Sequence, residues 1–123
     1  MRVGINGFGR IGRSVFRVLN NRDDIEVVAI NDIFDKDALT YLLKYDTVMG
    51  RFPGDISLDS DILSAGNQKV KLIAERVPEE LPWGELGVDI VIESTGIFRM
   101  RSQLQSHINA GAKKVILTVP AKD

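Results

Sequence analysis

Three glycines near the N-terminus have a spacing that suits phosphate binding. Gly7, Gly9 and Gly12 lie in the stretch INGFGRIGR, directly after an apolar run and directly before an amphipathic one. This order fits the pattern G-x-G-x-x-G at a turn from a strand into a helix. Gly7 would permit the tight turn, Gly9 would let a pyrophosphate approach the backbone, and Gly12 would allow close packing of the helix. The free N–H groups and the positive dipole end of that helix would then hold the phosphates.

The same spacing also suits a tight strand-to-helix turn that binds nothing. Asp32 favours the binding interpretation because it ends the second predicted strand, about 20 residues after Gly12. A carboxylate there accepts hydrogen bonds from both hydroxyls of an adenosine ribose and repels a 2′-phosphate. The sequence therefore predicts NAD as the cofactor in preference to NADP. The alternative for Asp32 is a solvated turn residue.

Further polar residues lie at the predicted carboxyl ends of strands. Thr95 and Gly96 follow a buried strand, and Thr118 ends the last one. Such strand ends line the ligand crevice of a doubly wound sheet, where Phe98 can pack beside a nicotinamide or adenine ring. An ordinary loop is the alternative. Arg10, at the start of the first helix, offers its backbone N–H to a phosphate, while its side chain can reach solvent, the pyrophosphate or another subunit.

Residues suited to catalysis are sparse. The sequence has no cysteine and one histidine, His107, which lies in a predicted helix without a nucleophile or metal-spaced partner beside it. We therefore expect an ordinary helix histidine. The acidic pairs, such as Glu79 and Glu80, are expected at helix caps and on the solvated surface. Trp83 and Phe52 are expected in the core or at an interface.

Alternating strand and helix patterns must position these residues. Apolar runs predict strands at 2–6, 25–30, 88–93 and 114–118, and helical spacing predicts helices from Arg10, after Asp35 and over 102–110. Residues 56–74 suggest short antiparallel strands around a turn at 65–67. We expect an α/β fold of Rossmann type: a doubly wound, mainly parallel sheet with a short antiparallel excursion.

Composition sets the outer bounds. The chain has 123 residues, of which 44% are hydrophobic, which is enough for one domain with a core. Sixteen basic residues stand against seventeen acidic ones, so charge does not point to nucleic acid or an anionic membrane. No apolar stretch has the length of a membrane span, and no signal sequence is visible. We expect a soluble, cytoplasmic protein.

Longer stretches of the sequence resemble a known enzyme family. They are VGINGFGRIGR, AINDIFD, YLLKYDTVMGRFPG, LPWGELGVDIVIESTGIF and INAGAKKVILTVPAKD. In this order they are similar to the N-terminal part of phosphorylating glyceraldehyde-3-phosphate dehydrogenase, over the whole of residues 1–123. The resemblance implies a cytoplasmic, homotetrameric glycolytic enzyme that oxidises an aldehyde through a cysteine thiohemiacetal, reduces NAD and releases an acyl phosphate. The related erythrose-4-phosphate dehydrogenase shares much of the pattern.

The resemblance also implies a set of cofactor contacts. The family's pyrophosphate contacts fall on the glycine-rich loop, its adenosine contacts on the end of the second strand and a later loop, and its remaining contacts on the last two strand ends. The residues are Gly7, Phe8, Gly9, Arg10, Ile11, Asn31, Asp32, Arg76, Thr95, Gly96, Phe98 and Thr118. Two departures from the family pattern, at Met49 and at Arg99-Met100-Arg101, lie away from these contacts.

The family's catalytic cysteine and histidine would lie beyond Asp123. On this resemblance we expect residues 1–123 to be an incomplete NAD-binding domain that binds NAD without catalysing the reaction. The missing part of the sheet cover would leave an apolar edge or face that favours self-association. The alternative is a dinucleotide-binding or interaction module that never performs catalysis.

Overall fold

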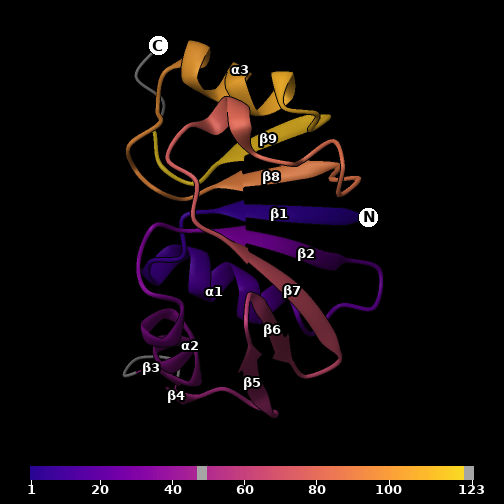
Figure 1. The fold of residues 1–123 in the computed structure, drawn as a ribbon, viewed down its shortest axis with the longest axis vertical. Helices are drawn as coiled ribbons and strands as arrows, with labels where there is room; N and C mark the ends of the chain where they lie inside the picture. Colours follow the sequence, from indigo (N-terminus) through magenta and orange to yellow (C-terminus); the bar gives the residue numbers. More distant parts are fainter. Residues whose placement is uncertain (47–49, 121–123) are drawn as a thin grey trace.

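The computed structural model describes residues 1–46 and 50–120, in which strands and helices alternate except between residues 45 and 73, where five strands follow one another (Figure 1). The helices are α1 (Arg10–Leu19), α2 (Lys36–Lys44) and α3 (Arg101–Asn109), with a 3₁₀ turn η1 (Pro78–Glu80). The strands are β1 (Arg2–Asn6), β2 (Glu26–Asn31), β3 (Tyr45–Asp46), β4 (Gly50–Arg51), β5 (Ile56–Asp59), β6 (Ile62–Ala65), β7 (Gln68–Ile73), β8 (Ile90–Glu93) and β9 (Lys114–Leu117). No helix within the described residues has both the length and the apolar character needed to cross a membrane.

Seven strands form the main sheet, in the order β5-β6-β7-β2-β1-β8-β9. The neighbours from β7 to β9 are parallel, whereas β5, β6 and β7 pair antiparallel. This arrangement confirms the predicted doubly wound sheet and its antiparallel excursion. The chain leaves β1 toward β2 on one side and later returns to β8 on the other (Figure 1). A crevice therefore opens at the carboxyl end of β1, where ligands bind in such sheets.

Apolar residues cover both faces of the sheet, as the doubly wound fold requires. On one face Phe16 of α1 and Leu39 and Leu43 of α2 pack against strand residues such as Ile5 and Val27. On the other face a second cluster is centred on Trp83, whose side chain is fully buried. Phe52 is also buried, so both large aromatics lie in the core as expected.

Three short elements are absent from the sequence prediction. Strands β3 and β4 pair through only two residues each, and η1 lies in a segment expected to be a connector. Strands of this length carry no alternating apolar pattern, which explains why the sequence does not indicate them. The departure at Met49 lies outside the described residues.

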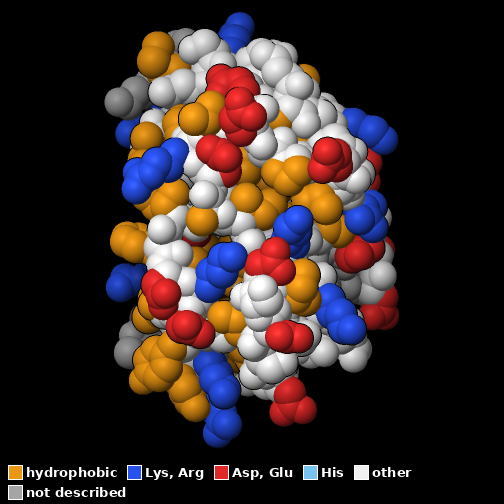
Figure 2. Space-filling model, viewed as in Figure 1, with side chains coloured by type: hydrophobic (Ala, Val, Ile, Leu, Met, Phe, Trp, Pro, Cys, Tyr) orange, Lys and Arg blue, Asp and Glu red, His pale blue; other side chains and the backbone are white. Residues whose placement is uncertain are grey.

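On the face shown in Figure 2, acidic and basic side chains are interspersed, as the balanced composition implies. Hydrophobic side chains gather at the lower left of this view, where Figure 1 places α2 and the β3–β4 pair. The exposed apolar residues of that region are Tyr41, Leu42 and Tyr45. This face therefore has an apolar region at α2 and the β3–β4 pair. Its acidic and basic side chains are mixed.

Candidate functional site

A cavity of about 360 Å³ lies at the carboxyl ends of the central parallel strands. It is bounded by the loops that follow β1, β2, β7 and β8. Its lining includes Gly7, Gly9, Asn31, Asp32, Arg76, Thr95 and Phe98, all of which the sequence predicts as cofactor contacts. It also includes Asn6, Ile33, Phe34, Glu75, Ser94 and Ile97. The structure thus brings together residues from four separate loops at the predicted crevice.

The glycine-rich loop forms one side of this cavity. Gly7 has a φ of +96°, and a Cβ there would lie 2.7 Å from the Thr95 backbone nitrogen. A Cβ on Gly12 would overlap the Gly7 carbonyl oxygen, so only glycine lets α1 pack this closely on the loop. A Cβ on Gly9 would meet no atom within 4 Å. Gly9 therefore faces open space, as the approach of a ligand requires.

The N-terminus of α1 is open to an anion. Gly9 occupies the N-cap position and has no side chain to accept a hydrogen bond from the helix, and the first turn contains no acidic residue. Arg10 and Ile11, the first two helical residues, are exposed. Their N–H groups and the positive end of the helix dipole face outward without a side-chain acceptor from the cap.

Asp32 is directly bonded to the glycine-rich loop. Its Oδ2 accepts a hydrogen bond of 2.7 Å from the Phe8 backbone N–H, and its Oδ1 accepts one of 3.0 Å from the Phe34 N–H. Each carboxylate oxygen keeps a further lone pair for a ligand hydroxyl. The carboxylate that would select the ribose therefore also fixes the loop that would hold the phosphates.

Phe8 contributes to the site by anchoring the loop, because its backbone N–H and carbonyl are both hydrogen-bonded within the protein. Its side chain is buried and packs edge-on against Phe16. Its N–H is bonded to Asp32, and its carbonyl accepts a hydrogen bond from the Arg13 guanidinium. The loop is thus anchored in the core, while Gly9 and the start of α1 remain open.

The other predicted residues surround the cavity at different depths. Arg76 is exposed and is the only basic residue among the described residues that line the cavity. Gly96 has a φ of +76° and lies in the exposed turn beyond Thr95. Thr118 does not line the cavity, and both its N–H and its hydroxyl donate to the Glu93 carbonyl oxygen.

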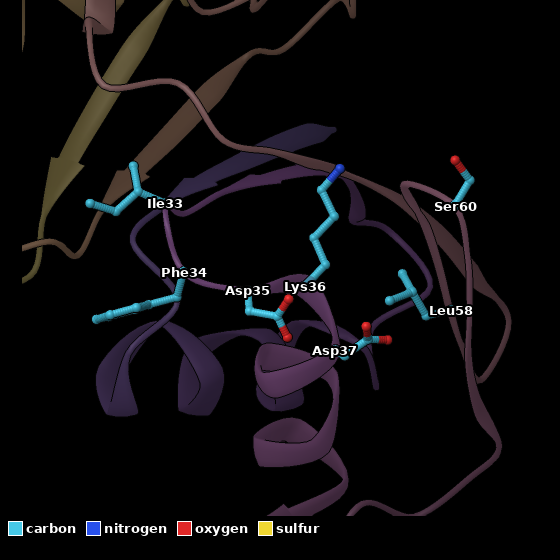
Figure 3. Close-up of a pocket in the computed structure, with 7 residues that line it drawn as sticks. All are labelled: Ile33, Phe34, Asp35, Lys36, Asp37, Leu58 and Ser60. Atoms are coloured by element: carbon cyan, nitrogen blue, oxygen red, sulfur yellow. The ribbon is translucent and has the colours of Figure 1, made fainter.

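A larger cavity of about 530 Å³ lies beside α2 and the β5–β6 hairpin (Figure 3). In Figure 3 the Lys36 side chain extends between Ile33 and Phe34 on one side and Leu58 and Ser60 on the other. Its lining contains none of the predicted cofactor contacts among the described residues. The cavity at the strand ends, and not this larger one, is therefore the candidate site.

The prediction from the sequence does not include the buried polar cluster that lies behind the site, apart from Asn31. Asn6, Asn31 and Glu93 end three adjacent strands, and Asn6 pairs in register with each of the other two. Asn6 and Glu93 are not among the predicted residues, and His107 is expected to be an ordinary helix histidine. In the structure His107 is fully buried, with its Nε2 2.7 Å from Glu93 Oε1. Three apolar strands that each end in a polar residue are the pattern that could have revealed this cluster.

The switch point in the sheet, the glycine-rich turn and the open helix N-terminus define a dinucleotide-binding domain of the Rossmann type. Within the cavity Ser94 has a buried hydroxyl oxygen with no hydrogen-bond partner among the described residues, so the lining holds an unused polar group. Together with the space at Gly9, these features fit a nucleotide cofactor.

Comparison with known proteins gives the family. Residues 1–101 match the family described as glyceraldehyde 3-phosphate dehydrogenase, NAD binding domain. The chain is 52% identical over 124 residues to glyceraldehyde-3-phosphate dehydrogenase of Streptomyces coelicolor and 53% identical over 123 residues to that of Escherichia fergusonii. It is 50% identical over 123 residues to the cytosolic enzyme of Trypanosoma brucei brucei. In each case all of this chain aligns with 37% of the relative's length.

The chain therefore belongs to the family of glyceraldehyde-3-phosphate dehydrogenase NAD-binding domains, and its cofactor is NAD. The predicted family, fold class and cofactor are confirmed. The chain spans little more than a third of the length of the relatives that it matches.

Proposed function

We propose that this chain supplies the NAD site of a phosphorylating glyceraldehyde-3-phosphate dehydrogenase. The intact protein would oxidise an aldehyde phosphate to an acyl phosphate in glycolysis, as a homotetramer in the cytoplasm. Bound NAD supplies the acceptor for the hydride that leaves the aldehyde. The observation that carries the proposal is the open N-terminus of α1 with Asp32 bonded to the loop that precedes it.

The diphosphate of NAD would lie against the start of α1. The N–H groups of Gly9, Arg10 and Ile11 are the donors that the geometry leaves for it, because the Gly7 N–H donates to the Asn31 carbonyl and the Phe8 N–H donates to Asp32. Gly7 and Phe8 would then contribute by shaping and anchoring the loop. The helix dipole adds a favourable interaction with the negative charge.

The two halves of the dinucleotide would use opposite walls of the cavity. On one wall Asp32 would accept hydrogen bonds from the adenosine ribose, with Asn31 behind it and Arg76 near the adenine. On the other wall the loop after β8 would face the second nucleotide through Thr95, Gly96 and Phe98, with Thr118, outside the cavity lining, near the nicotinamide ribose. This division follows the order of the strands around the switch point.

Replacing Asp32 tests the site. Asp32→Asn removes the charge but keeps one acceptor oxygen, whereas Asp32→Ala removes both. We expect calorimetry on the intact protein to show the ratio of NAD to NADP affinity falling about tenfold or more in both variants, because the repulsion of the 2′-phosphate is lost. Asp32→Ala should also weaken both cofactors, since the Phe8 N–H loses its acceptor.

The matched control is Asp37→Ala, which removes an exposed carboxylate from the first turn of α2. We expect it to leave the affinity ratio unchanged. An unchanged ratio in Asp32→Asn and Asp32→Ala would reject the ribose assignment. For the reaction, the intact protein should reduce NAD only when both glyceraldehyde 3-phosphate and inorganic phosphate are present, and phosphate-independent reduction would reject the phosphorylating activity.

A further inference from the structure

Glu93, the last residue of β8, is a fully buried carboxylate behind the candidate site. Four hydrogen-bond donors surround it. On Oε1 these are Asn6 Nδ2 and His107 Nε2, both at 2.7 Å. On Oε2 they are the Thr95 backbone N–H at 3.0 Å and the Thr95 hydroxyl at 2.6 Å. Asn6 and Thr95 both line the cavity, so Glu93 contacts the site through its neighbours.

The direction of the His107 bonds follows from Trp83. The indole Nε1–H of Trp83 can only donate, and it lies 3.0 Å from His107 Nδ1. Nδ1 must therefore accept, and the ring proton must be on Nε2, which donates to Glu93. His107 in this arrangement is neutral and offers Glu93 a fixed N–H donor.

The orientations of the Asn31 and Asn6 side-chain amides are fixed in the same way, starting from the opposite side of the site. The Glu75 backbone N–H donates to Asn31 Oδ1 at 2.8 Å, and Asn31 Nδ2 donates to the Glu75 carbonyl at 2.9 Å. Asn31 Nδ2 also donates to Asn6 Oδ1 at 2.7 Å. The Asn6 oxygen must accept, so its Nδ2 donates to Glu93. Each bond in this chain follows from the one before it, starting at the backbone.

An ionised carboxylate is the side chain that satisfies these donors at position 93. A glutamine has nearly the same shape, but one of its two terminal atoms is an NH₂ donor. At the Oε1 position that group would face the His107 N–H, and at the Oε2 position it would face the Thr95 backbone N–H. Neither orientation avoids a clash of two donors, and an unsatisfied buried donor costs far more than an exposed one.

The network joins the two walls of the cavity. Thr95 belongs to the loop after β8, whereas Asn31 and Glu75 belong to the end of β2 and the loop after β7. Building on the proposed function, in which NAD occupies this cavity, we propose that Glu93 is a positioning residue for the cofactor. Its buried carboxylate holds the Thr95 wall and, through Asn6 and Asn31, the Glu75 wall in one arrangement before NAD binds. Preorganisation of this kind raises affinity without direct contact.

The first test is Glu93→Gln in the intact protein. We expect calorimetry to show NAD affinity falling about tenfold or more while circular dichroism retains the wild-type spectrum. Hydrogen exchange at the Glu75 amide should accelerate, because the variant disturbs Asn6 and so weakens the Asn31–Asn6 bond that supports the Asn31–Glu75 pair. The matched control is Glu79→Gln, since Glu79 is exposed, accepts a bond from Ser106 and lies outside the cavity. It should change neither NAD affinity nor exchange at Glu75.

A second pair of variants decides the matter if Glu93→Gln fails to fold. His107 lies on α3 and does not line the cavity. His107→Leu removes one donor to Glu93, and we expect about threefold to tenfold weaker NAD binding. His107→Gln can accept from Trp83 and donate to Glu93 as the imidazole does, so it should bind within twofold of wild type. Rescue by glutamine would show that the hydrogen bond matters and not the imidazole ring.

Two results would overturn the inference while leaving the proposed function intact. One is wild-type NAD affinity in a folded Glu93→Gln variant with unchanged exchange at Glu75. The other is equal NAD affinity in His107→Leu and His107→Gln. A wild-type protein that fails to bind NAD would instead reject the proposed function itself. Calorimetry of the wild-type protein with NAD, done first, distinguishes this result from the other two.

Discussion

Helices α1 and α2 begin in opposite ways, although both follow a strand of the same sheet. The N-cap of α2 is Asp35, whose carboxylate accepts a 2.9 Å hydrogen bond from the Ala38 N–H, and Asp37 adds a negative charge in the first turn. The N-cap of α1 is Gly9, which has no side-chain acceptor, and its first turn has no acid. The first turn of α2 has an acceptor from its own sequence, whereas the first turn of α1 has no side-chain acceptor from its cap.

The third helical residue repeats the contrast. In α2 this position is Ala38, which is exposed. In α1 it is Gly12, where a Cβ would overlap the Gly7 carbonyl oxygen. Glycine inside a helix weakens it, so Gly12 costs α1 stability, and Gly9 leaves the cap of α1 without a side-chain acceptor. The comparison teaches that the start of α1 is shaped for a close approach of other groups at the expense of helix stability.

The largest expected effect comes from giving α1 the kind of cap that α2 has. Gly9 has a φ of −76°, and a Cβ at this position would have no neighbour within 4 Å, so Gly9→Asp fits without strain. Its carboxylate would lie where the diphosphate is expected to bind and would repel that negatively charged group. We expect NAD affinity to fall about 100-fold or more by calorimetry, with stability unchanged or raised by roughly a few tenths of a kcal/mol.

Gly9→Asn separates charge from occupancy in this experiment. Asparagine caps helices about as well as aspartate but carries no charge. We expect it to weaken NAD binding less than Gly9→Asp does. Undiminished NAD affinity in Gly9→Asp would mean that the start of α1 does not hold the phosphates, and the contrast with α2 would lose its functional meaning.

Exchanging residues at the third helical position is the next test. Gly12→Ala should destabilise the fold by about 1–3 kcal/mol, because the added carbon overlaps the backbone of the loop. Ala38→Gly in α2 should cost about 1 kcal/mol or less, through helix propensity alone. Denaturant unfolding of both variants measures the difference. Equal losses would show that the close packing at Gly12 is not required.

The glycine-rich start of α1 can be predicted from the sequence, because glycine spacing and an apolar strand are local patterns. The strands at 2–6 and 114–117 and the capped start of α2 are predictable for the same reason. For the polar support of the site, the sequence shows that β1, β2 and β8 each end in a polar residue but not which of these residues bond to one another. Asn6 and Glu93 meet only because β1 and β8 pair in register after a long intervening excursion. A tertiary contact of this kind leaves no periodic trace in a single sequence.

Asp32 illustrates the limit in a single residue. The sequence predicts a ribose contact for Asp32 only from its position after the second strand and its distance along the chain from the glycines. The structure adds that it accepts the Phe8 N–H, a bond that spans 24 residues. His107 shows the converse, because an ordinary helical position conceals a fully buried partner of Glu93. Burial depends on what packs over a helix, which a helical pattern alone does not specify.

Removing the cap of α2 should affect stability alone. Asp35→Ala deletes the acceptor of the Ala38 N–H, and we expect a loss of about 1 kcal/mol in the free energy of unfolding. NAD affinity should stay within twofold of wild type, since Asp35 does not line the candidate site. Thermal unfolding and calorimetry on the same preparation measure the two quantities. A large loss of NAD binding would break the division between a structural and a ligand-binding helix start.

The smallest effect is expected at the opposite end of β1, where a carboxylate again satisfies a backbone N–H. Asp89 Oδ2 accepts from the Arg2 N–H at 3.0 Å, and Oδ1 lies 3.1 Å from Lys113 Nζ. The Arg2 N–H and then Lys113 hold the pKa of Asp89 below its ordinary value. Since the pKa is lowered on folding, this group stabilises the fold above the ordinary aspartate pKa of about 4, and the stabilisation is lost as pH falls through the folded value.

Asp89→Asn should therefore be less stable than wild type at pH 7, and the gap should shrink as the pH is lowered below about 4. Urea unfolding between pH 3 and pH 7 measures this gap, and NAD affinity should not change. Lys113→Gln is the control: it leaves the bond from Arg2, which is the larger cause, so most of the pH dependence should remain. A gap that stays constant over the whole pH range would show that an N–H satisfied by a carboxylate contributes nothing through ionisation. The contrast with the unsatisfied N–H groups of α1 would then have to be explained by hydrogen bonding alone.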